Sequence, residues 1–266
     1  MSSKSFLATR FENGQMRTCE DPLTVERPLQ IKINGRPFSV TMRSPGDDQY
    51  LVKGLLYTEG IVNPDAGDYT CTEEYLEDSR EVIAINVEVP EAYLCDSAFD
   101  KRSLLANASC GLCGQRQLDL EELGSRALKP RASLALNRVS ELMGAMRDSQ
   151  QTFDQTGSTH AAAVFGQDYK LIFLHEDIGR HNAVDKSVGR LIDSGRLDEA
   201  EILCVSGRVS FEIVIKAYRA DIPFLLAVSA PSSFAVEMSE IWGISVLGYC
   251  REQRATVYSH TENVKS

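Results

Sequence analysis

The chain has 266 residues, of which 43% are hydrophobic and 25% are charged, and its formal net charge is -10. This composition is typical of a soluble globular protein with room for one large domain or two smaller ones. Because the lysines and arginines form no cluster larger than a pair, the sequence argues against a nucleic-acid partner, while a local basic site for a small anion stays compatible with it.

Residues 1–24 are polar and show no regular apolar period, so we expect a loose N-terminal arm. They lack the apolar stretch of a secretory signal peptide, and no later segment has about 18 uninterrupted apolar residues. We therefore expect a cytoplasmic protein without a membrane partner. The chain has seven cysteines, an odd number. In a reducing compartment a closely spaced cysteine pair more often binds metal or reacts than forms a structural disulfide.

The packed chain is predicted to begin near residue 25. Apolar residues alternate over residues 29–33 and are followed by Asn34-Gly35, which favours a type I′ turn and hence a β-hairpin. A helix is predicted over residues 47–60, because carboxylates stand at its start, leucines share one face and a glycine ends it. Residues 81–89 alternate between apolar and polar side chains, as a strand does.

From about residue 130 helical and strand patterns alternate. The predicted strands cover residues 160–165, 169–177, 200–207, 223–230 and 244–250. The predicted helices cover residues 134–146, 183–192, 210–220 and 232–243. This alternation predicts an α/β domain with a largely parallel sheet covered by helices.

Polar residues gather at the predicted loop ends of this sheet, where ligands bind in open α/β proteins. The candidate positions are Gly157, Ser158, His160, Ser206, Arg208 and Ser229. The segment EDIGRHNAVDK, residues 176–186, adds further charged side chains, and together they predict a phosphate-bearing ligand. Neither GxGxxG nor a Walker motif occurs, which argues against a common dehydrogenase or P-loop enzyme. Taken alone, Ser206 and Arg208 also fit the start of a helix without a ligand, and His160 fits a hydrogen-bonded buried histidine.

The segment ASCGLCGQ places Cys110 and Cys113 three positions apart among small residues. A structural zinc site needs four ligands, and without a second CxxC zinc would have to recruit Cys71 or Cys95. A thioredoxin-like redox pair is disfavoured, because Cys110 does not follow an expected strand of a βαβ unit. A zinc deaminase needs an earlier histidine, and none precedes Cys110. A nucleophilic or sulfur-carrying cysteine fits better, since small neighbours leave the thiol accessible and Arg116 favours the thiolate.

Seven segments carry a family resemblance: ERPLQIKING, LYTEGIV, SCGLCG, TGSTHAA, EDIGRHNAVDKSVGRLI, SGRVSFEIVIKA and YCREQRATVY. With them the chain resembles the FdhD family, the formate dehydrogenase accessory sulfurtransferases, over nearly all residues after about 25. The resemblance implies that residues 131–266 form a cytidine deaminase-like α/β domain without zinc chemistry. It also implies that residues 25–130 form a smaller N-terminal α+β region, which carries the CxxC loop.

The resemblance further implies an activity. A protein of this kind takes sulfane sulfur from a cysteine desulfurase as a cysteine persulfide. It passes the sulfur to molybdenum bis(molybdopterin guanine dinucleotide), the cofactor that formate dehydrogenase or a related molybdoenzyme then uses. By motif, Cys110 corresponds to the persulfide cysteine and Cys113 to an auxiliary thiol, with no metal ligand. The cofactor is a bound substrate, GDP would bind as its fragment, and a homodimer is expected.

The family's cofactor-binding stretch corresponds to six residues: Tyr249, Cys250, Arg251, Glu252, Gln253 and Arg254. Two departures occur there, because Tyr249 stands for the usual phenylalanine and Glu252-Gln253 for a frequent Pro-Gly. Two other functions stay open. One is a cofactor-binding chaperone in which Cys110 is structural, and the other is an interaction protein stabilised by zinc.

Overall fold

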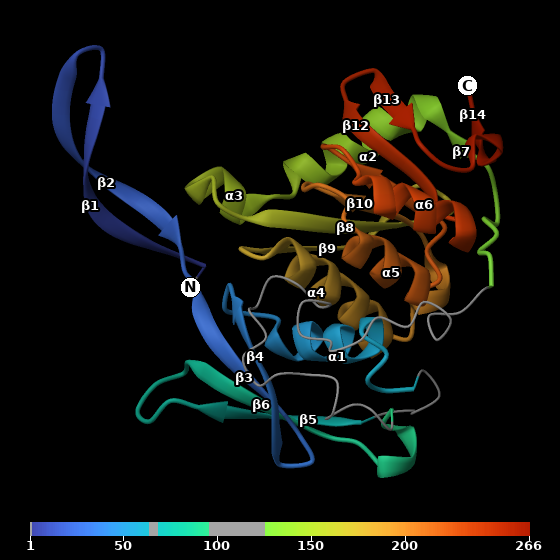
Figure 1. Ribbon diagram of the computed structural model, residues 1–266. Helices are drawn as coiled ribbons and strands as arrows, with labels where there is room; N and C mark the ends of the chain where they lie inside the picture. Colours follow the sequence, from blue (N-terminus) through green and yellow to red (C-terminus); the bar gives the residue numbers. More distant parts are fainter. Residues whose placement is uncertain (1, 64–68, 96–125) are drawn as a thin grey trace.

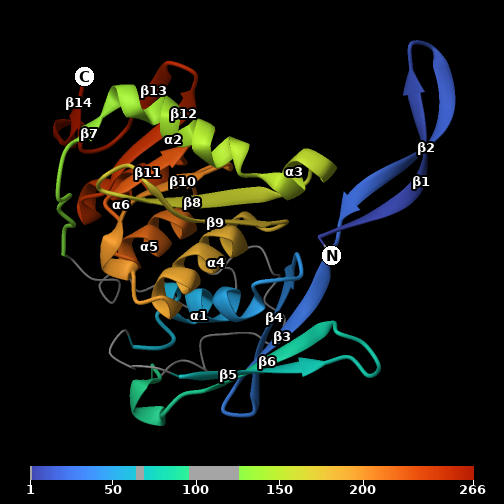
Figure 2. The same ribbon diagram turned by 180° about the vertical axis from the view of Figure 1, so that it is seen from behind.

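The computed structural model describes residues 2–63, 69–95 and 126–266. A slender N-terminal arm stands away from a layered body in two opposite views (Figures 1 and 2). Cys110 and Cys113 lie outside the described residues, so the predicted loop around them is not described. No helix in the described part of the chain is long and apolar enough to cross a membrane.

The N-terminal arm is a β-hairpin, so the prediction of a loose arm is wrong. Strands β1 (Ser3–Glu12) and β2 (Gln15–Thr24) pair in antiparallel register along their whole length. The turn is Asn13-Gly14, with φ angles of 52° and 79°, which suits a type I′ turn. The alternation of side chains was hard to recognise because most of the arm's side chains on both faces are exposed.

The N-terminal part of the body is a four-stranded sheet covered by one helix. The strands are β3 (Arg27–Ile33), β4 (Arg36–Arg43), β5 (Thr70–Tyr75) and β6 (Val82–Glu88), in the order β4-β3-β6-β5. The hairpin predicted at Asn34-Gly35 is confirmed as β3-β4. The predicted helix is confirmed as α1 (Asp48–Thr58), whose leucines pack on the sheet. A 3-10 turn, η2 (Glu91–Tyr93), follows β6.

The C-terminal part contains a six-stranded mixed sheet. Its strands are β8 (His160–Gly166), β9 (Leu171–Asp177), β10 (Ala200–Val205), β11 (Phe224–Ala227), β12 (Ser245–Arg251) and β13 (Arg254–Val257). They lie in the order β13-β12-β11-β10-β8-β9. The prediction of a largely parallel sheet is wrong, because β10 pairs parallel with β11 and β11 with β12, while the other three pairings are antiparallel. The two hairpins β8-β9 and β12-β13 produce this mixture.

Helices cover both faces of this sheet (Figures 1 and 2). On one face lie α2 (Leu136–Asp148) and α3 (Gln151–Thr156), and on the other α4 (Arg180–Asp193), α5 (Phe211–Arg219) and α6 (Ser233–Trp242). The short η3 (Leu197–Glu199) precedes β10, and η4 (Thr261–Asn263) precedes β14 (Val264–Lys265), which pairs with β7 (Leu134–Ala135). Leu128 is buried in the core beneath α4 to α6, so this core starts before the predicted domain start at residue 131.

Two glycines bring helices α1 and α4 into backbone contact. A Cβ atom on Gly54 would lie 1.8 Å from the carbonyl oxygen of Asp185, and one on Gly189 would lie 1.9 Å from that of Tyr50. No side chain fits at either position without moving a helix. The layer made of α1 and the four-stranded sheet is therefore packed directly on the C-terminal part.

A buried ionic cluster lies at the end of the same contact. The ammonium group of Lys216, on α5, lies 2.8 and 2.9 Å from the two carboxylate oxygens of Asp185, on α4. It also donates to Thr58, the last residue of α1, at 2.9 Å and to Glu59, the next residue, at 3.1 Å. Burial alone would lower the pKa of Lys216, but the carboxylates of Asp185 and Glu59 outweigh it and raise that pKa. The buried ammonium group of Lys216 thus connects α5 with α4 and with the end of α1.

Replacing Gly54 by alanine should destabilise the protein. Because the new methyl group meets backbone atoms of α4, the helices must separate, and we expect a loss of about 3 kcal/mol in the free energy of unfolding. Gly144→Ala is the matched control, since that glycine lies in α2 with nothing within 4 Å of an added Cβ. The control should be neutral or stabilising by up to about 1 kcal/mol. Urea denaturation of the three proteins measures both effects, and equal stability of Gly54→Ala and wild type would contradict this account.

Candidate functional site

The candidate site lies at the edge of the six-stranded sheet where β10 ends and β8 begins. Ser206 directly follows β10, and its hydroxyl accepts a hydrogen bond from the backbone N–H of Ala161 at 2.9 Å. The same hydroxyl lies 3.4 Å from Nδ1 of His160, the first residue of β8. The structure therefore brings together two predicted site residues that are 46 positions apart in sequence.

Gly207 and Arg180 complete the centre of this edge. A Cβ atom on Gly207 would lie 3.5 Å from both Cδ of Arg180 and Nδ1 of His160, so both side chains lie at contact distance from this glycine. The Nε atom of Arg180 is buried and has no hydrogen-bond partner in the described part of the chain. A buried N–H without an acceptor is costly, and a bound anion would satisfy it. The sequence analysis included Arg180 only as one of the charged residues of EDIGRHNAVDK and did not choose it as a site residue, although its place just after β9 and Gly179 was a signal of a strand-to-helix junction.

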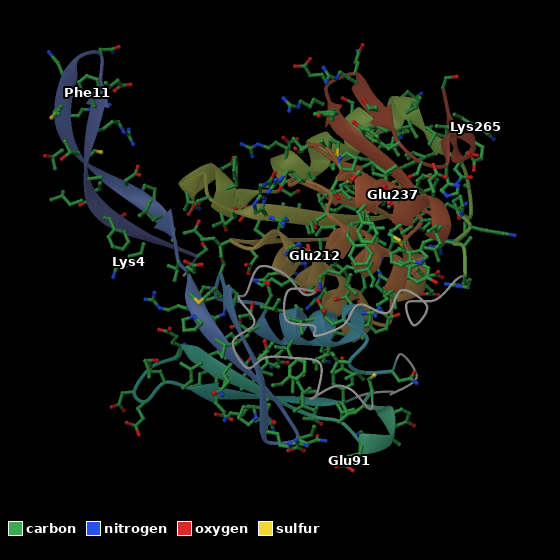
Figure 3. All side chains as sticks on the ribbon, viewed as in Figure 1. Lys4, Phe11, Glu91, Glu212, Glu237 and Lys265 are labelled. Carbon is green, nitrogen blue, oxygen red and sulfur yellow. The ribbon has the colours of Figure 1, made fainter. Side chains whose placement is uncertain are left out.

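The edge is cationic. Burial lowers the pKa of His160, and the nearby basic side chains of Arg180, His181 and Arg208 lower it further, against the opposing effect of Asp177. His160 is therefore neutral near pH 7 and surrounded by basic groups. Glu212, labelled in Figure 3 and located in the first turn of α5, partly balances them. It lies 3.2 Å from Nε2 of His181, and this contact lowers its pKa.

Three further predicted residues lie at the ends of neighbouring elements. The carbonyl oxygen of Ser229, after β11, accepts the backbone N–H of Tyr249 at 3.2 Å, so that the ends of β11 and β12 are adjacent. The Ser158 hydroxyl lies 2.7 Å from that of Thr24, at the base of the N-terminal arm. Gly157 ends α3 in a left-handed conformation with φ 66°.

The predicted cofactor-binding stretch forms the hairpin β12-β13. Tyr249 and Glu252 have positive φ angles of 55° and 49°, and the Arg254 guanidinium lies 5.5 Å from the centre of the Tyr249 ring. The side chains of Arg251, Glu252, Gln253 and Arg254 are exposed. The hairpin tip borders a cavity of about 450 Å³ above the first turns of α2.

Cys250 differs from its neighbours in this stretch. It is only 2% exposed, and its side chain belongs to the core between α2 and the sheet. Burial raises the pKa of its thiol to about 11. The Cys250 side chain therefore does not lie on the predicted binding surface, because strand alternation turns it inward between Tyr249 and Arg251.

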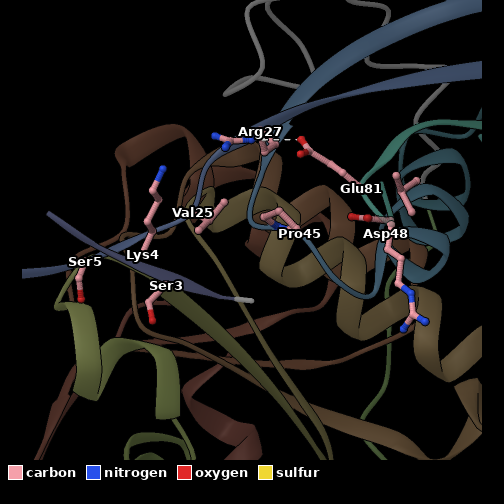
Figure 4. A pocket seen from close by; sticks show the side chains of 10 residues that line it. Ser3, Lys4, Ser5, Val25, Arg27, Pro45, Asp48 and Glu81 are labelled. Atoms are coloured by element: carbon pink, nitrogen blue, oxygen red, sulfur yellow. Dashed lines mark ion pairs between the residues drawn. The ribbon is translucent and has the colours of Figure 1, made fainter. Parts of the chain in front are cut away.

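Two other cavities lie near the base of the arm. One of about 650 Å³ separates the arm from the four-stranded sheet (Figure 4). Arg27 and Glu81 form an ion pair across its wall at 3.1 Å, and Asp48 is bound by Arg43. The charges of Arg27, Glu81 and Asp48 are thus neutralised within the protein, and Lys4 and Arg80 are the other charged residues that line this cavity.

The second cavity, of about 350 Å³, is polar and contains His175 and Lys186. Lys186 donates to Asp177 at 2.8 Å and to the carbonyl oxygen of Ser44 at 2.9 Å. Burial lowers the pKa of His175 to about 4. Within residues 2–63, 69–95 and 126–266, no three His, Cys, Asp or Glu side chains are grouped closely enough to hold a metal ion.

The chain matches the family model described as FdhD/NarQ over residues 24–265. It is 37% identical to the sulfur carrier protein FdhD of Streptomyces coelicolor, over 96% of this chain and 93% of that relative. It is 36% identical to the protein of the same name from Sulfolobus acidocaldarius, over 99% of each. A crystal structure from Desulfotalea psychrophila, described as a candidate formate dehydrogenase accessory protein, has a TM-score of 0.78 at 21% identity and 100% coverage of both chains. That similarity shows the fold.

The low pKa of His175 predicts a loss of stability in acid. An unfolded histidine binds its proton near pH 6.5, whereas folded His175 does so near pH 4. Between these values the unfolded state binds more protons, so the free energy of unfolding should fall by about 3 kcal/mol as the pH drops from 6.5 to 4. Denaturation at a series of pH values should show a shallower decline for His175→Gln.

His260→Gln is the control for this measurement. Burial lowers the pKa of His260, but hydrogen bonds to Glu262 and the Glu240 carbonyl outweigh it and raise the pKa. Its stabilising effect is therefore complete below pH 6.5 and is lost as the pH rises above that value. The decline between pH 6.5 and 4 should be as steep in this variant as in wild type. If His175→Gln also keeps the full decline, another group causes it.

Proposed function

Because the chain belongs to the FdhD/NarQ family, we propose that it is a sulfur carrier that serves as an accessory protein of a formate dehydrogenase. Curated relatives at 36–37% identity over more than nine-tenths of the chain are named sulfur carrier proteins. The structural observation that supports the proposal is the cationic edge around Gly207, where the buried Nε of Arg180 faces no acceptor. A sulfur carrier for a nucleotide-bearing cofactor needs such an anion site.

The proposed substrate is molybdenum bis(molybdopterin guanine dinucleotide), which carries two pyrophosphate groups. One pyrophosphate would accept hydrogen bonds from Arg180 and Arg208, with the Ser206 hydroxyl and the neutral His160 ring beside it. Because Gly207 has no side chain, its backbone leaves room for a phosphate next to Arg180 and His160. Tyr249 and Arg254, on the β12-β13 hairpin, extend this surface past Ser229.

The proposed sulfur-carrying residue is Cys110, which lies outside the described residues. Its thiolate attacks the outer sulfur of the persulfide on a cysteine desulfurase. A new S–S bond forms on Cys110, the S–S bond of the donor breaks, and the donor cysteine leaves as a thiolate. In the transfer to the cofactor an electron pair of the acceptor forms the new bond to the outer sulfur, the S–S bond on Cys110 breaks, and Cys110 leaves as a thiolate. Cys113 is proposed as an auxiliary thiol: if its thiolate attacks the inner sulfur of the persulfide instead, a Cys110–Cys113 disulfide forms and hydrosulfide leaves.

Three of the other cysteines are poor competitors for the sulfur. Burial raises the pKa of Cys71 and of Cys250 to about 11 each, and that of Cys204 well above its usual value. A thiol reacts as the thiolate, so these side chains stay protonated and inert near neutral pH. Burial therefore argues against three of the seven cysteines as carriers, whereas Cys19 is only partly buried and Cys95 is exposed.

We also infer from the family that residues 131–266 form a cytidine deaminase-like domain and residues 25–130 the smaller region with the CxxC loop. A homodimer, a cysteine desulfurase as donor and a formate dehydrogenase or related molybdoenzyme as client follow from the same membership. These inferences do not depend on anion binding by Arg180 and Arg208, so each of them is tested separately.

Sulfur loading tests the carrier role. After incubation with a cysteine desulfurase and cysteine, the intact mass of the wild-type chain should increase by one sulfur atom. Cys110→Ser should abolish this increase and the activation of formate dehydrogenase while leaving GDP binding intact, and Cys113→Ser should lose less. A Cys110→Ser protein that still accepts labelled sulfur and activates its client would replace the carrier by the cofactor-binding chaperone.

Nucleotide binding tests the anion site. GDP should bind as a fragment of the cofactor and bind more tightly than ADP in calorimetry. Arg208→Ala and Arg180→Ala should each weaken GDP binding by roughly 1.5 to 3 kcal/mol, because each removes a charge-assisted hydrogen bond. Arg196→Ala is the control, since this exposed arginine pairs with Glu199 at the opposite end of β10. Equal or absent binding of both nucleotides would contradict the guanine assignment.

A further inference from the structure

The ring of His160 presents its Nδ1 nitrogen to the centre of the candidate site. Nδ1 lies 3.4 Å from the Ser206 hydroxyl and would lie 3.5 Å from a Cβ atom on Gly207. Because the Ser206 oxygen already accepts the backbone N–H of Ala161 at 2.9 Å, the hydroxyl proton is left to be donated to Nδ1. The neutral ring then carries its own proton on Nε2, and Nδ1 is an acceptor.

A bound anion reverses what this nitrogen must do. The oxygens of a phosphate diester accept hydrogen bonds, so the lone pair of a neutral Nδ1 would repel them. With a proton on each ring nitrogen, the imidazolium ring donates through Nδ1, and the Ser206 hydroxyl can turn its own proton toward the same ligand. The Arg180 side chain reaches the same place, and its buried Nε still lacks an acceptor in the described part of the chain.

The charged groups around His160 come from three parts of the chain. They are Arg180 and His181 at the start of α4, Arg208 after β10, and Asp177 at the end of β9. Burial and the three basic groups lower the pKa of His160 in the free chain, and Asp177 opposes them. Asp177 is itself bound by Lys186 at 2.8 Å. A pyrophosphate diester brings two negative charges into these surroundings, which favours the charged form of the ring.

We propose that His160 takes up a proton from the solvent when a pyrophosphate-bearing ligand binds at this edge of the sheet. The lone pair of Nδ1 forms the new N–H bond, the ring becomes an imidazolium ion, and no other covalent bond is made or broken. His160 is then a hydrogen-bond donor to phosphate in the complex only. The inference rests on the proposed anion site and adds that the affinity of this site depends on pH.

The direction of this pH dependence follows from the protons held by the two states. The bound ligand raises the pKa of His160 above its value in the free chain. When the pH is below both pKa values or above both, the free chain and the complex hold the same number of protons, and the affinity is constant. Between them the complex holds the additional proton, so the affinity falls as the pH rises.

The other three histidines of the chain have different surroundings. His175 lines the polar cavity near the base of the arm, and His260 directly precedes η4. His181 belongs to the same edge as His160, but its Nε2 already lies 3.2 Å from the carboxylate of Glu212 on α5. A bound anion therefore changes the electrostatic surroundings of His160 more than those of any other histidine.

Calorimetry with GDP-mannose tests the coupling. This nucleotide is a pyrophosphate diester, as the proposed cofactor is, and it lacks the terminal phosphate whose own titration near pH 6 would obscure that of the protein. From about pH 6 to about pH 8, the dissociation constant of the wild-type chain should rise about three- to tenfold per pH unit. A comparison of buffers with low and high ionisation enthalpy should show the uptake of up to about one proton per bound nucleotide.

Variants of the histidines identify the group that takes up the proton. His160→Gln keeps a side chain that forms hydrogen bonds but does not titrate, so its affinity should change less than about twofold over this pH range, without proton uptake. His260→Gln is the matched control, because this histidine lies outside the site, and it should behave as wild type does. His181→Gln should still take up the proton.

Nuclear magnetic resonance of the histidine-labelled wild-type chain gives a second readout that does not depend on affinity. The imidazole signal that is missing from His160→Gln should change from the neutral to the doubly protonated form when GDP-mannose is added near pH 7. Binding without proton uptake, or uptake that persists in His160→Gln, overturns this inference and leaves the anion site in place. If neither GDP-mannose nor GDP binds at any pH, the anion site itself is overturned, and the inference with it.

Discussion

The buried contact between Lys216 and Asp185 determines how the parts of this protein fit together. Its two charges come from α5 and α4, and the remaining donors of the ammonium group are satisfied by Thr58 and Glu59 at the end of α1. Removing one partner of such a pair leaves an uncompensated buried charge, which lowers the free energy of unfolding by about 3 to 5 kcal/mol. The candidate site lies only one to two helical turns away, because Arg180 begins α4 five residues before Asp185 and Glu212 lies in the first turn of α5, four residues before Lys216. The relative position of the charged residues in the candidate site therefore depends on the contact between Lys216 and Asp185, which lies outside the site.

Local and global charge have opposite signs in this molecule. The chain as a whole is acidic, yet His160 is surrounded by three basic side chains at the sheet edge. A small anion is attracted at close range, where burial reduces screening, while extended polyanions such as nucleic acid are repelled by the rest of the surface. The backbone of Gly207 and the free Nε of Arg180 give this positive edge a defined shape. The site is therefore suited to a compact phosphate group.

Much of the architecture could be predicted from local sequence signals, and the errors have physical causes. Asn34-Gly35 correctly marked a hairpin, but the same signal at Asn13-Gly14 was overlooked because the flanking strands bury neither face. The hairpin at Glu252-Gln253 has no glycine, so the antiparallel edge of the sheet was missed. His160 and Ser206 were both predicted at loop ends of the sheet, but they are neighbours because β8 runs antiparallel to β10, which brings the start of β8 beside the end of β10. Arg180 required the structure, since an unpaired buried atom depends on three-dimensional neighbours.

The contact between Gly54 and Gly189 has a consequence for how this protein can evolve. Two regions with separate sheets would ordinarily be expected to recombine as modules, each exchanged for a relative's version. Here each region contributes a helix with a glycine, Gly54 in α1 and Gly189 in α4, and the two backbones lie so close together that neither position has room for a Cβ atom. A transplanted N-terminal layer with any other residue at position 54 would collide with α4. The two regions must therefore be inherited as one unit, and sequence changes at these two helices are coupled.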